Sequence, residues 1–224
     1  MEKVKVLYFV DRMLRGGIQT FILENWKHMD NSKIQVDFLL LDDGVNYELE
    51  DTLREMGSKV FKLNGIWIRK PWDYVKYYKA LDEFFKQNND YQVVHFHSAS
   101  KNFLVLALAK KYGIKIRIAH SHSIAFNTTS KIRVVCGNIL KYFLQKYSTD
   151  YFACSELAGQ WLFGKKKRVT VVKNAVDINK FCYNREKSEQ IKKQLGLKDN
   201  FVIGHTGRFT HQKNHQFLIQ IFNE

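Results

Sequence analysis

Two histidine pairs are the densest group of chemically versatile side chains in the sequence. One residue separates His95 from His97, and one separates His120 from His122. Each pair closes an apolar run typical of a buried strand, so strand alternation should place both members of a pair on one face, and the ends of the two strands should neighbour each other. Such imidazoles can bind zinc, belong to a core, or hydrogen-bond a polar ligand. All three interpretations stay open, and His122, furthest beyond its strand, is the best candidate for a ligand contact.

A glycine pair forms the second candidate group. Gly16 and Gly17 belong to the segment RGGIQ, which stands between an apolar run and a helical pattern. Glycines there let the backbone approach a ligand, and the N-terminus of a helix favours an anion. A tight turn is an equally good explanation of such a pair, and the segment matches neither GxGxxG nor a Walker loop.

The third group lies in GHTGRFTHQKNH, residues 204–215. Gly207 and Arg208 follow an apolar run, Lys213 comes next, and Asn214 suits the N-cap of a helix. A glycine and two cations ahead of a helix are typical of an anion site. Solvated surface charge is the alternative interpretation, because the chain has 36 basic residues.

The elements that hold these groups alternate regularly along the chain. Apolar runs predict buried strands, and apolar residues at helical spacing predict the helices between them. The predicted strands are 4–10, 34–41, 59–63, 91–97, 114–119, 151–154, 169–172 and 201–204. The predicted helices are 18–29, 48–56, 73–85, 102–112 and 130–147, with one more beginning near 214. This order predicts an α/β protein with a Rossmann-like, doubly wound parallel sheet.

The alternation also predicts how the chain divides. Residues 1–175 complete one Rossmann-like domain, 176–199 form a lysine-rich linker, and 200–224 begin a second domain. The final unit has one strand and one helix, so its apolar residues have no sheet of their own to enter. We therefore expect the second domain to be incomplete in this chain, through truncation.

Composition limits the class of protein. With 45% hydrophobic residues the chain can bury a large core, and its apolar runs are too short to span a bilayer. Three widely spaced cysteines without a CxxC indicate neither a disulfide framework nor a zinc site, and the N-terminus has no secretion signal. We therefore expect a cytoplasmic protein. The net charge of +14 suits a phosphorylated ligand, an anionic membrane or nucleic acid.

The order of the motifs resembles glycosyltransferase family 4, the retaining enzymes with a GT-B fold, and especially the bacterial capsule and exopolysaccharide transferases. The resemblance covers nearly the whole chain. The matching segments are RGGIQ, VVHFHS, IAHSHS, ACSELAGQWLFG, VVKNAVDINKF and IGHTGRFTHQKNH. It implies two facing Rossmann-like domains, the first for the acceptor and the second for a nucleotide-diphosphate sugar held in the cleft between them.

The resemblance also implies roles for single residues. Gly16, Gly17, Gly207, Arg208 and Lys213 correspond to groups around the donor diphosphate. His122 corresponds to the catalytic histidine that reaches the transferred sugar. The residues left for the acceptor side or the cleft are His95, His97, His120, Ser155 and Asn174. Fixed cations and helix ends can stabilise a departing diphosphate, so we expect no metal and no cofactor besides the donor substrate.

Two features depart from the family pattern. Ala175 stands where the family commonly has glycine, and alanine tolerates a positive φ poorly. The paired glutamates of the family's E-x7-E motif, which bind sugar and ribose, have no counterpart at that spacing in residues 1–224. We therefore expect this chain to be inactive by itself. The resemblance implies that the family's reaction is the transfer of a hexose to a saccharide acceptor, and we expect that acceptor to be lipid-linked.

Other classes of function stay open beside the enzyme. A non-catalytic acceptor domain would bind a lipid-linked acceptor, a membrane or a partner without transferring sugar. A nucleic-acid-binding module would suit the charge, but no recognition motif is present, so we expect no nucleic acid. Residues 67–85 and 130–148 combine aromatic, apolar and basic side chains as interfacial helices do, which predicts peripheral contact with the inner face of the cell membrane. The alternative is that their apolar stripes belong to the core.

Overall fold

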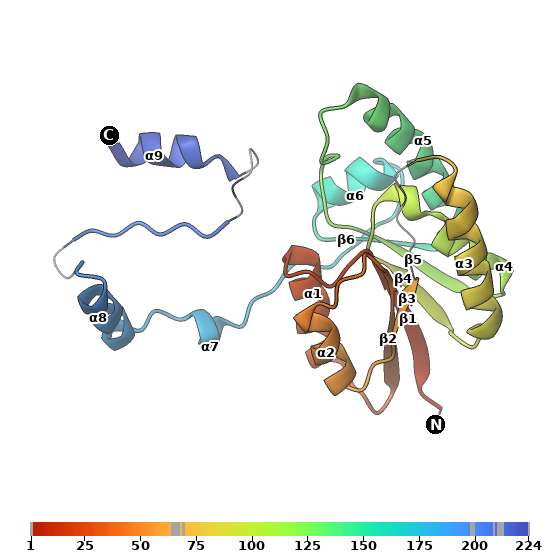
Figure 1. The fold of residues 1–224 in the computed structure, drawn as a ribbon, viewed down its shortest axis with the longest axis horizontal. Coiled ribbons are helices and arrows are strands. Elements are labelled where there is room, and N and C mark those ends of the chain that lie inside the picture. Colours follow the sequence, from red (N-terminus) through yellow and green to blue (C-terminus); the bar gives the residue numbers. More distant parts are fainter. Residues whose placement is uncertain are drawn as a thin grey trace. The chain divides into compact units, whose positions relative to one another are not determined.

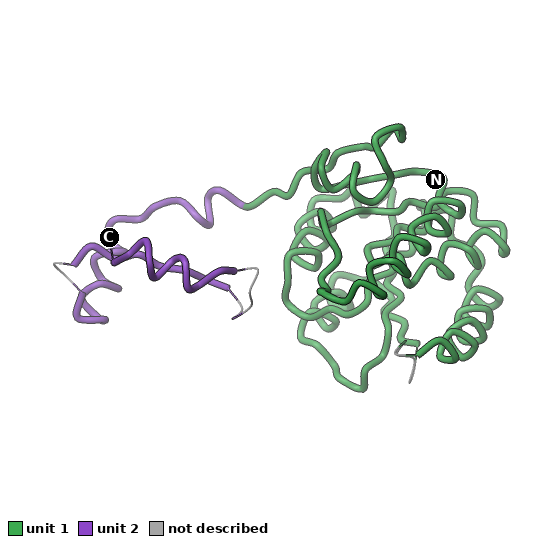
Figure 2. The backbone as a smooth tube through the Cα atoms, turned by 90° about the horizontal axis from the view of Figure 1, so that it is seen from above, with its two compact units in different colours: residues 1–176 green, residues 177–224 purple. Residues whose placement is uncertain are grey.

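The computed structural model describes residues 2–63, 68, 70–197, 200–207, 209 and 213–223. The chain divides into two compact units, residues 1–176 and 177–224, which Figure 2 distinguishes by colour.

Unit 1 is built on a seven-stranded parallel sheet (Figure 1). The strand order is β3-β2-β1-β4-β5-β6-β7, so the chain winds outward in both directions from the neighbours β1 and β4. This order confirms the predicted doubly wound sheet. The strands are β1 (Val4–Val10), β2 (Ile34–Leu41), β3 (Val60–Leu63), β4 (Val93–Phe96), β5 (Ile116–Ser121), β6 (Asp150–Ala153) and β7 (Thr170–Val171).

Helices cover both faces of this sheet (Figure 1). Side chains alternate along each strand, so Leu7 and Phe9 enter one core while Tyr8 and Val10 enter the other. Helices α1 and α2 close the face of Tyr8, and α3, α4, α5 and α6 close the opposite face. Their bounds are α1 (Gly17–Lys27), α2 (Glu48–Glu55), α3 (Asp73–Gln87), the 3-10 turn η1 (Ser100–Asn102), α4 (Leu104–Lys111), α5 (Lys131–Tyr147) and α6 (Glu156–Phe163).

The described residues of unit 2 form three short helices and include no buried side chain. The helices are α7 (Ile178–Phe181), α8 (Arg185–Gln194) and α9 (His215–Asn223). The predicted linker thus contains two helices, which begin where the side chains of Asp177 and Asn184 accept hydrogen bonds from backbone N–H groups. Helix α9 confirms the helix predicted near residue 214.

The strand predicted over 201–204 is wrong. The backbone of residues 201–207 forms no strand, and the Phe201 side chain is 86% exposed. An isolated strand has no ladder of hydrogen bonds to join, so its apolar sequence is not sufficient. Across the described residues of both units, none of the helices combines the length and apolar character needed to cross a bilayer.

Because the cores lie in unit 1, we expect residues 1–176 to fold without the rest of the chain. Deleting 177–224 should change the free energy of unfolding by less than about 1 kcal/mol, which is a shift in Tm of less than about 4 °C. Calorimetry of both polypeptides measures this shift. A fragment that lost its near-ultraviolet circular dichroism would show that unit 1 needs unit 2 for its packing.

Candidate functional site

The sheet topology places the candidate groups of unit 1 at one edge. β1 and β4 are neighbours whose following connections run in opposite directions, which is the switch point where α/β sheets bind ligands. The glycine pair follows β1, His97 follows β4, and His122 follows β5. The predicted neighbouring of the two histidine strands is confirmed by the parallel pairing of β4 with β5.

The glycine pair forms the beginning of helix α1. Gly16 is the N-cap residue, with an extended backbone, and no described side chain caps the helix. A Cβ on Gly16 would lie 2.9 Å from Oε1 of Gln19, whose Nε2 donates to the Arg12 carbonyl at 2.6 Å. Around Gly17 a Cβ would meet no described atom within 4 Å. The first N–H groups of α1 therefore stand beside two exposed glycines, with no acidic residue in the first turn.

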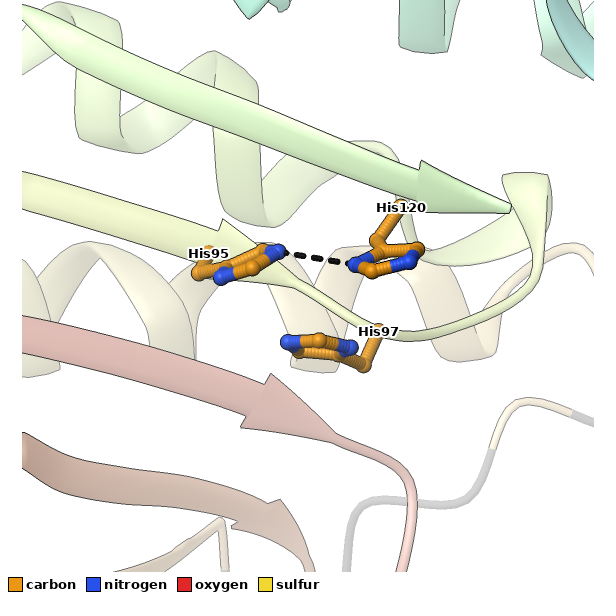
Figure 3. Close-up of side chains that lie close together, drawn as sticks. All are labelled: His95, His97 and His120. Carbon is orange, nitrogen blue, oxygen red and sulfur yellow. Dashed lines mark hydrogen bonds between the residues drawn. The ribbon is translucent and has the colours of Figure 1, made fainter. Parts of the chain in front are cut away.

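The four histidines form one stack at the edge of the sheet (Figure 3 shows three of them). Nε2 of His95 lies 3.1 Å from Nδ1 of His120, and Nδ1 of His97 lies 2.9 Å from Nε2 of His122. The rings of His120 and His122 are stacked at 4.3 Å, and those of His95 and His97 lie 4.0 Å apart. Two hydrogen bonds and face-to-face packing therefore hold the rings together.

Aromatic side chains enclose this stack. The Tyr8 ring lies 4.9 Å from the rings of both His95 and His97. The Phe21 ring, from the second turn of α1, lies 5.3 Å from His122. Phe21 thus joins the helix that the glycines begin to the histidine that follows β5.

Burial keeps these imidazoles neutral. It lowers the pKa of His95 to about 3, of His120 to about 2 and of His122 to about 4, and it lowers the pKa of His97 well below the usual value. Desolvation is the largest cause in each case, because a charged ring loses its hydration. Among the described residues, Nε2 of His97 and Nε2 of His120 are buried without a hydrogen-bond partner.

Three of the histidines could also ligate a metal. His95, His97 and His120 bring ring nitrogens within 4.8 Å of one another. Zinc at about 2.0 Å from each nitrogen would hold them about 3.4 Å apart in a tetrahedron. The planes of the His95 and His120 rings are nearly parallel, at an angle of 12°, and the two rings share a hydrogen bond that such a metal would have to break. The observed geometry is that of a hydrogen-bonded stack.

A polar cluster that the sequence reasoning missed braces the same edge from the other face. Asp11, directly after β1, accepts hydrogen bonds from Ser98 Oγ and, at 2.8 Å, from Asn102 Nδ2. Asn102 also donates to Ser98 Oγ at 2.7 Å. The cluster ties the loop after β1 to the loop after β4. A carboxylate immediately following a buried strand was the available signal.

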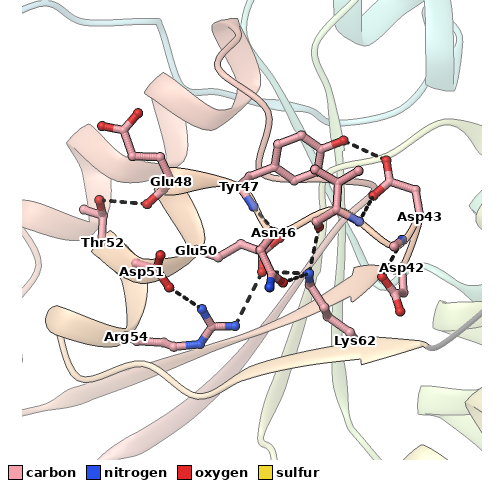
Figure 4. A network of polar contacts seen from close by, with 12 residues as sticks. Asp42, Asp43, Asn46, Tyr47, Glu48, Glu50, Asp51, Thr52, Arg54 and Lys62 are labelled. Carbon is pink, nitrogen blue, oxygen red and sulfur yellow. Dashed lines mark hydrogen bonds and ion pairs between the residues drawn. The ribbon is translucent and has the colours of Figure 1, made fainter.

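A second polar network holds the loop after β2 (Figure 4). Arg12 Nη1 lies 3.0 Å from Asp43 Oδ2, which also accepts from the Tyr47 hydroxyl at 2.7 Å. The Tyr47 hydrogen bond is the largest cause of the lowered pKa of Asp43. Buried Glu50 pairs with Lys62 at 2.9 Å. These contacts fix the start of α2 beside the glycine loop.

The remaining predicted site residues follow β6 and β7 at this same edge or belong to unit 2. Ser155 caps α6, since its hydroxyl accepts from Ala158 N at 3.2 Å. Asn174 is exposed. A Cβ on Gly207 would lie 3.3 Å from Lys213 Cγ and Cδ, so these two residues are adjacent within unit 2. Arg208 lies outside the described residues.

The backbone φ angles at Asn214 and Ala175 test two of the sequence-based expectations. Asn214 has a φ of 46°, a conformation that asparagine tolerates well, and it directly precedes α9 as predicted. Among the described non-glycine residues it alone has a positive φ, so Ala175 carries none of the strain that its substitution for glycine predicts.

Comparison with known proteins gives the family of the chain. Residues 15–180 match the model of Glycosyltransferase Family 4. The match extends over well more than half of the chain, and the chain belongs to this family. The resemblance inferred from its motifs is confirmed.

Curated relatives agree with this assignment. EpsF of Bacillus subtilis (strain 168) is 28% identical over 227 residues, covering 97% of this chain and 57% of EpsF. The capsular polysaccharide biosynthesis glycosyltransferase CapH of Staphylococcus aureus is 26% identical over 224 residues, covering 97% of this chain and 57% of CapH. An Escherichia coli UDP-Gal:alpha-D-GlcNAc-diphosphoundecaprenol alpha-1,3-galactosyltransferase is 25% identical over 220 residues. The alignment covers 95% of this chain and 56% of that enzyme. The chain therefore spans little more than half the length of these relatives.

Solved structures agree on the fold. Anabaena HepE in complex with UDP and glucose superposes with a TM-score of 0.74 at 17% identity, covering 98% of this chain and 57% of HepE. MurG of Acinetobacter baumannii superposes with a TM-score of 0.54 at 14% identity, covering 80% of this chain and 47% of MurG. The likeness confirms the Rossmann-like fold predicted from the sequence.

The neutral histidines predict a strong dependence of stability on pH. The unfolded chain takes up protons near pH 6.5 while the folded stack does not, so stability falls as pH drops below 6.5 towards the lowered pKa values. Each of His95, His97 and His120 should contribute about 1.4 kcal/mol per pH unit. Urea unfolding between pH 6.5 and 5 measures the slope. Replacing His120 with Gln should reduce the pH slope of the free energy of unfolding by the equivalent of one proton. The exposed control His28→Gln should leave the contribution of the histidine stack to this slope unchanged.

If the free energy of unfolding changed between pH 6.5 and 5 by less than the uptake of one proton on unfolding requires, the histidines would not be neutral in the folded protein.

Proposed function

We propose that the complete protein is a retaining hexosyltransferase that moves a sugar from a nucleotide-diphosphate sugar to a saccharide acceptor in capsule or exopolysaccharide synthesis. One observation carries the proposal. The uncapped start of α1 and His122 lie on the same side of the sheet, joined by the Phe21 ring at 5.3 Å from His122. An anion-binding helix end beside a neutral imidazole suits a phosphorylated sugar.

The donor in this proposal is a nucleotide-diphosphate sugar. Two solved neighbours support it, because HepE was crystallised with UDP and glucose and with UDP-glucose. In the proposed mechanism backbone N–H groups of Gly16 and Gly17 bind the diphosphate, and the family resemblance assigns its positive charge to Lys213 and Arg208. As the bond to the sugar breaks, the departing diphosphate gains negative charge that these donors stabilise.

His122 contacts the transferred sugar in this mechanism. Its Nε2 shares a hydrogen bond with His97, so its Nδ1 is the nitrogen left for a ligand. The lowered pKa keeps the ring neutral at physiological pH, where it can hydrogen-bond a sugar hydroxyl without a charge of its own. We propose that no metal takes part, since helix end and cations supply the required stabilisation.

The acceptor is a lipid-linked saccharide in this proposal. The Escherichia coli relative supports it, because its name gives a sugar on diphosphoundecaprenol as the acceptor. Such an acceptor places the enzyme at the inner face of the cell membrane as a peripheral protein. The other residues at the sheet edge, His95, His97 and His120, hold His122 in position.

A transfer assay tests this function. Residues 1–224, continued by the remainder of CapH, should transfer sugar from a UDP-sugar to a lipid-linked acceptor analogue. A polypeptide of residues 1–224 alone should not, because it contains no glutamates at the E-x7-E spacing. Robust turnover by that polypeptide would show that the catalytic groups are misplaced.

Three substitutions in the same chimera test the residue assignments. His122→Ala, Arg208→Ala and Lys213→Ala should each cost on the order of 2 to 4 kcal/mol in transition-state stabilisation, measured as kcat/KM. His28→Ala and Lys193→Ala replace an exposed histidine and an exposed lysine and serve as controls. Wild-type rates in the first three variants would refute the roles given to them.

A further inference from the structure

Helix α5 turns apolar side chains towards solvent. Ile132 is 77% exposed, Val135 59%, Ile139 56% and Tyr142 65%. These residues are spaced by three, four and three positions, which places them in one stripe along the helix. A helix at the surface of a domain ordinarily shows polar residues there. We call this stripe the α5 face.

The opposite side of α5 fixes this orientation. Leu144 is buried in the core. A Cβ on Gly137 would lie 2.6 Å from the Phe126 ring, so the helix packs closely there. Lys141 Nζ donates to the Trp161 carbonyl at 2.9 Å and lies 3.8 Å from the centre of its ring. The helix therefore cannot turn the α5 face inward without losing these contacts.

Every charged side chain of helix α5 is basic. Helix α5 carries four basic residues and no acidic one, and Lys131, Arg133 and Lys146 are exposed. The longer segment 91–149 contains nine basic residues and no Asp or Glu. An anionic surface is thus attracted along the helix, and the attraction falls as salt screens it.

The second predicted interfacial segment, residues 67–85, behaves differently. In α3 the side chains of Tyr77, Leu81 and Phe85 belong to the core, although Trp72 and Val75 are exposed. Trp67 lies outside the described residues. The apolar stripe of α3 therefore belongs to the core, whereas the second of these two segments, α5, exposes an apolar stripe.

We propose that the α5 face is a docking surface for a bilayer that contains anionic lipid. Ile132, Val135, Ile139 and Tyr142 enter the boundary between headgroups and acyl chains, while Lys131 and Lys146 meet lipid phosphates. Two copies of the chain packed through this face would bring their cations together, whereas anionic lipid neutralises them. The proposal deepens the proposed use of a lipid-linked acceptor, yet binding to vesicles requires neither donor nor turnover.

Vesicle sedimentation of residues 1–224 at low salt tests the proposal. The chain should bind vesicles of phosphatidylcholine mixed with phosphatidylglycerol far better than phosphatidylcholine alone. The double variant Ile132→Gln/Ile139→Gln should lower the partition coefficient at least about tenfold. Lys131→Gln/Lys146→Gln should lower it about fivefold per charge. Val45→Gln, an apolar residue 48% exposed in the loop before α2, should leave binding unchanged.

Three results would overturn the proposal. These are equal binding of the wild-type chain to both vesicles, wild-type binding by the isoleucine variant, and a dimer in sedimentation equilibrium that this variant abolishes. The last would identify the α5 face as an interface between copies. Circular dichroism spectra and Tm values establish whether each variant is folded. If the isoleucine variant is unfolded, Tyr142→Ser is tested in its place. Because no donor is present, failed sugar transfer leaves this outcome unaffected.

Discussion

The hydrogen bond between His97 and His122 joins the ends of β4 and β5, and the geometry of the candidate site depends on it. Among the described residues Nε2 of His97 has no hydrogen-bond partner. The buried ring is therefore hydrogen-bonded through Nδ1, which lies 2.9 Å from Nε2 of His122. Losing this bond would leave the whole imidazole desolvated and unpaired, which is costly in a core. The same bond holds His122 against Phe21, and through Phe21 against α1.

Neutral imidazoles suit such a position better than other polar side chains. Each neutral ring can donate through one nitrogen and accept through the other, so each pair can share a hydrogen bond inside the sheet edge without a counterion. Edge-to-face contacts of Tyr8 with His95 and of Phe21 with His120 pack the imidazoles against aromatic rings. The arrangement supplies a rigid polar surface beside a helix end. A protonated stack would instead place like charges within about 5 Å of one another, where they repel strongly.

The sequence predicted the sheet well because buried parallel strands are continuous apolar runs. It also predicted that His95 and His120 would be neighbours, since both end adjacent strands. It failed where three-dimensional context decides. The apolar residues 201–204 have no partner strand, α8 is helical despite lacking an apolar face, and α6 went unpredicted. The bracing cluster around Asp11 was missed because Asn102 is distant in sequence and its burial follows from the fold.

Nitrogen-detected NMR spectra of the histidine rings test the central claim most directly, namely that the site is built on four neutral, mutually hydrogen-bonded imidazoles. In residues 1–224 labelled at the imidazole nitrogens, the account predicts that the rings of His95, His97, His120 and His122 remain neutral at pH 6. It also predicts hydrogen-bond couplings between His95 and His120 and between His97 and His122. Protonation of His97 or His122 near pH 6.5, or independent ring tautomers without couplings, would contradict it.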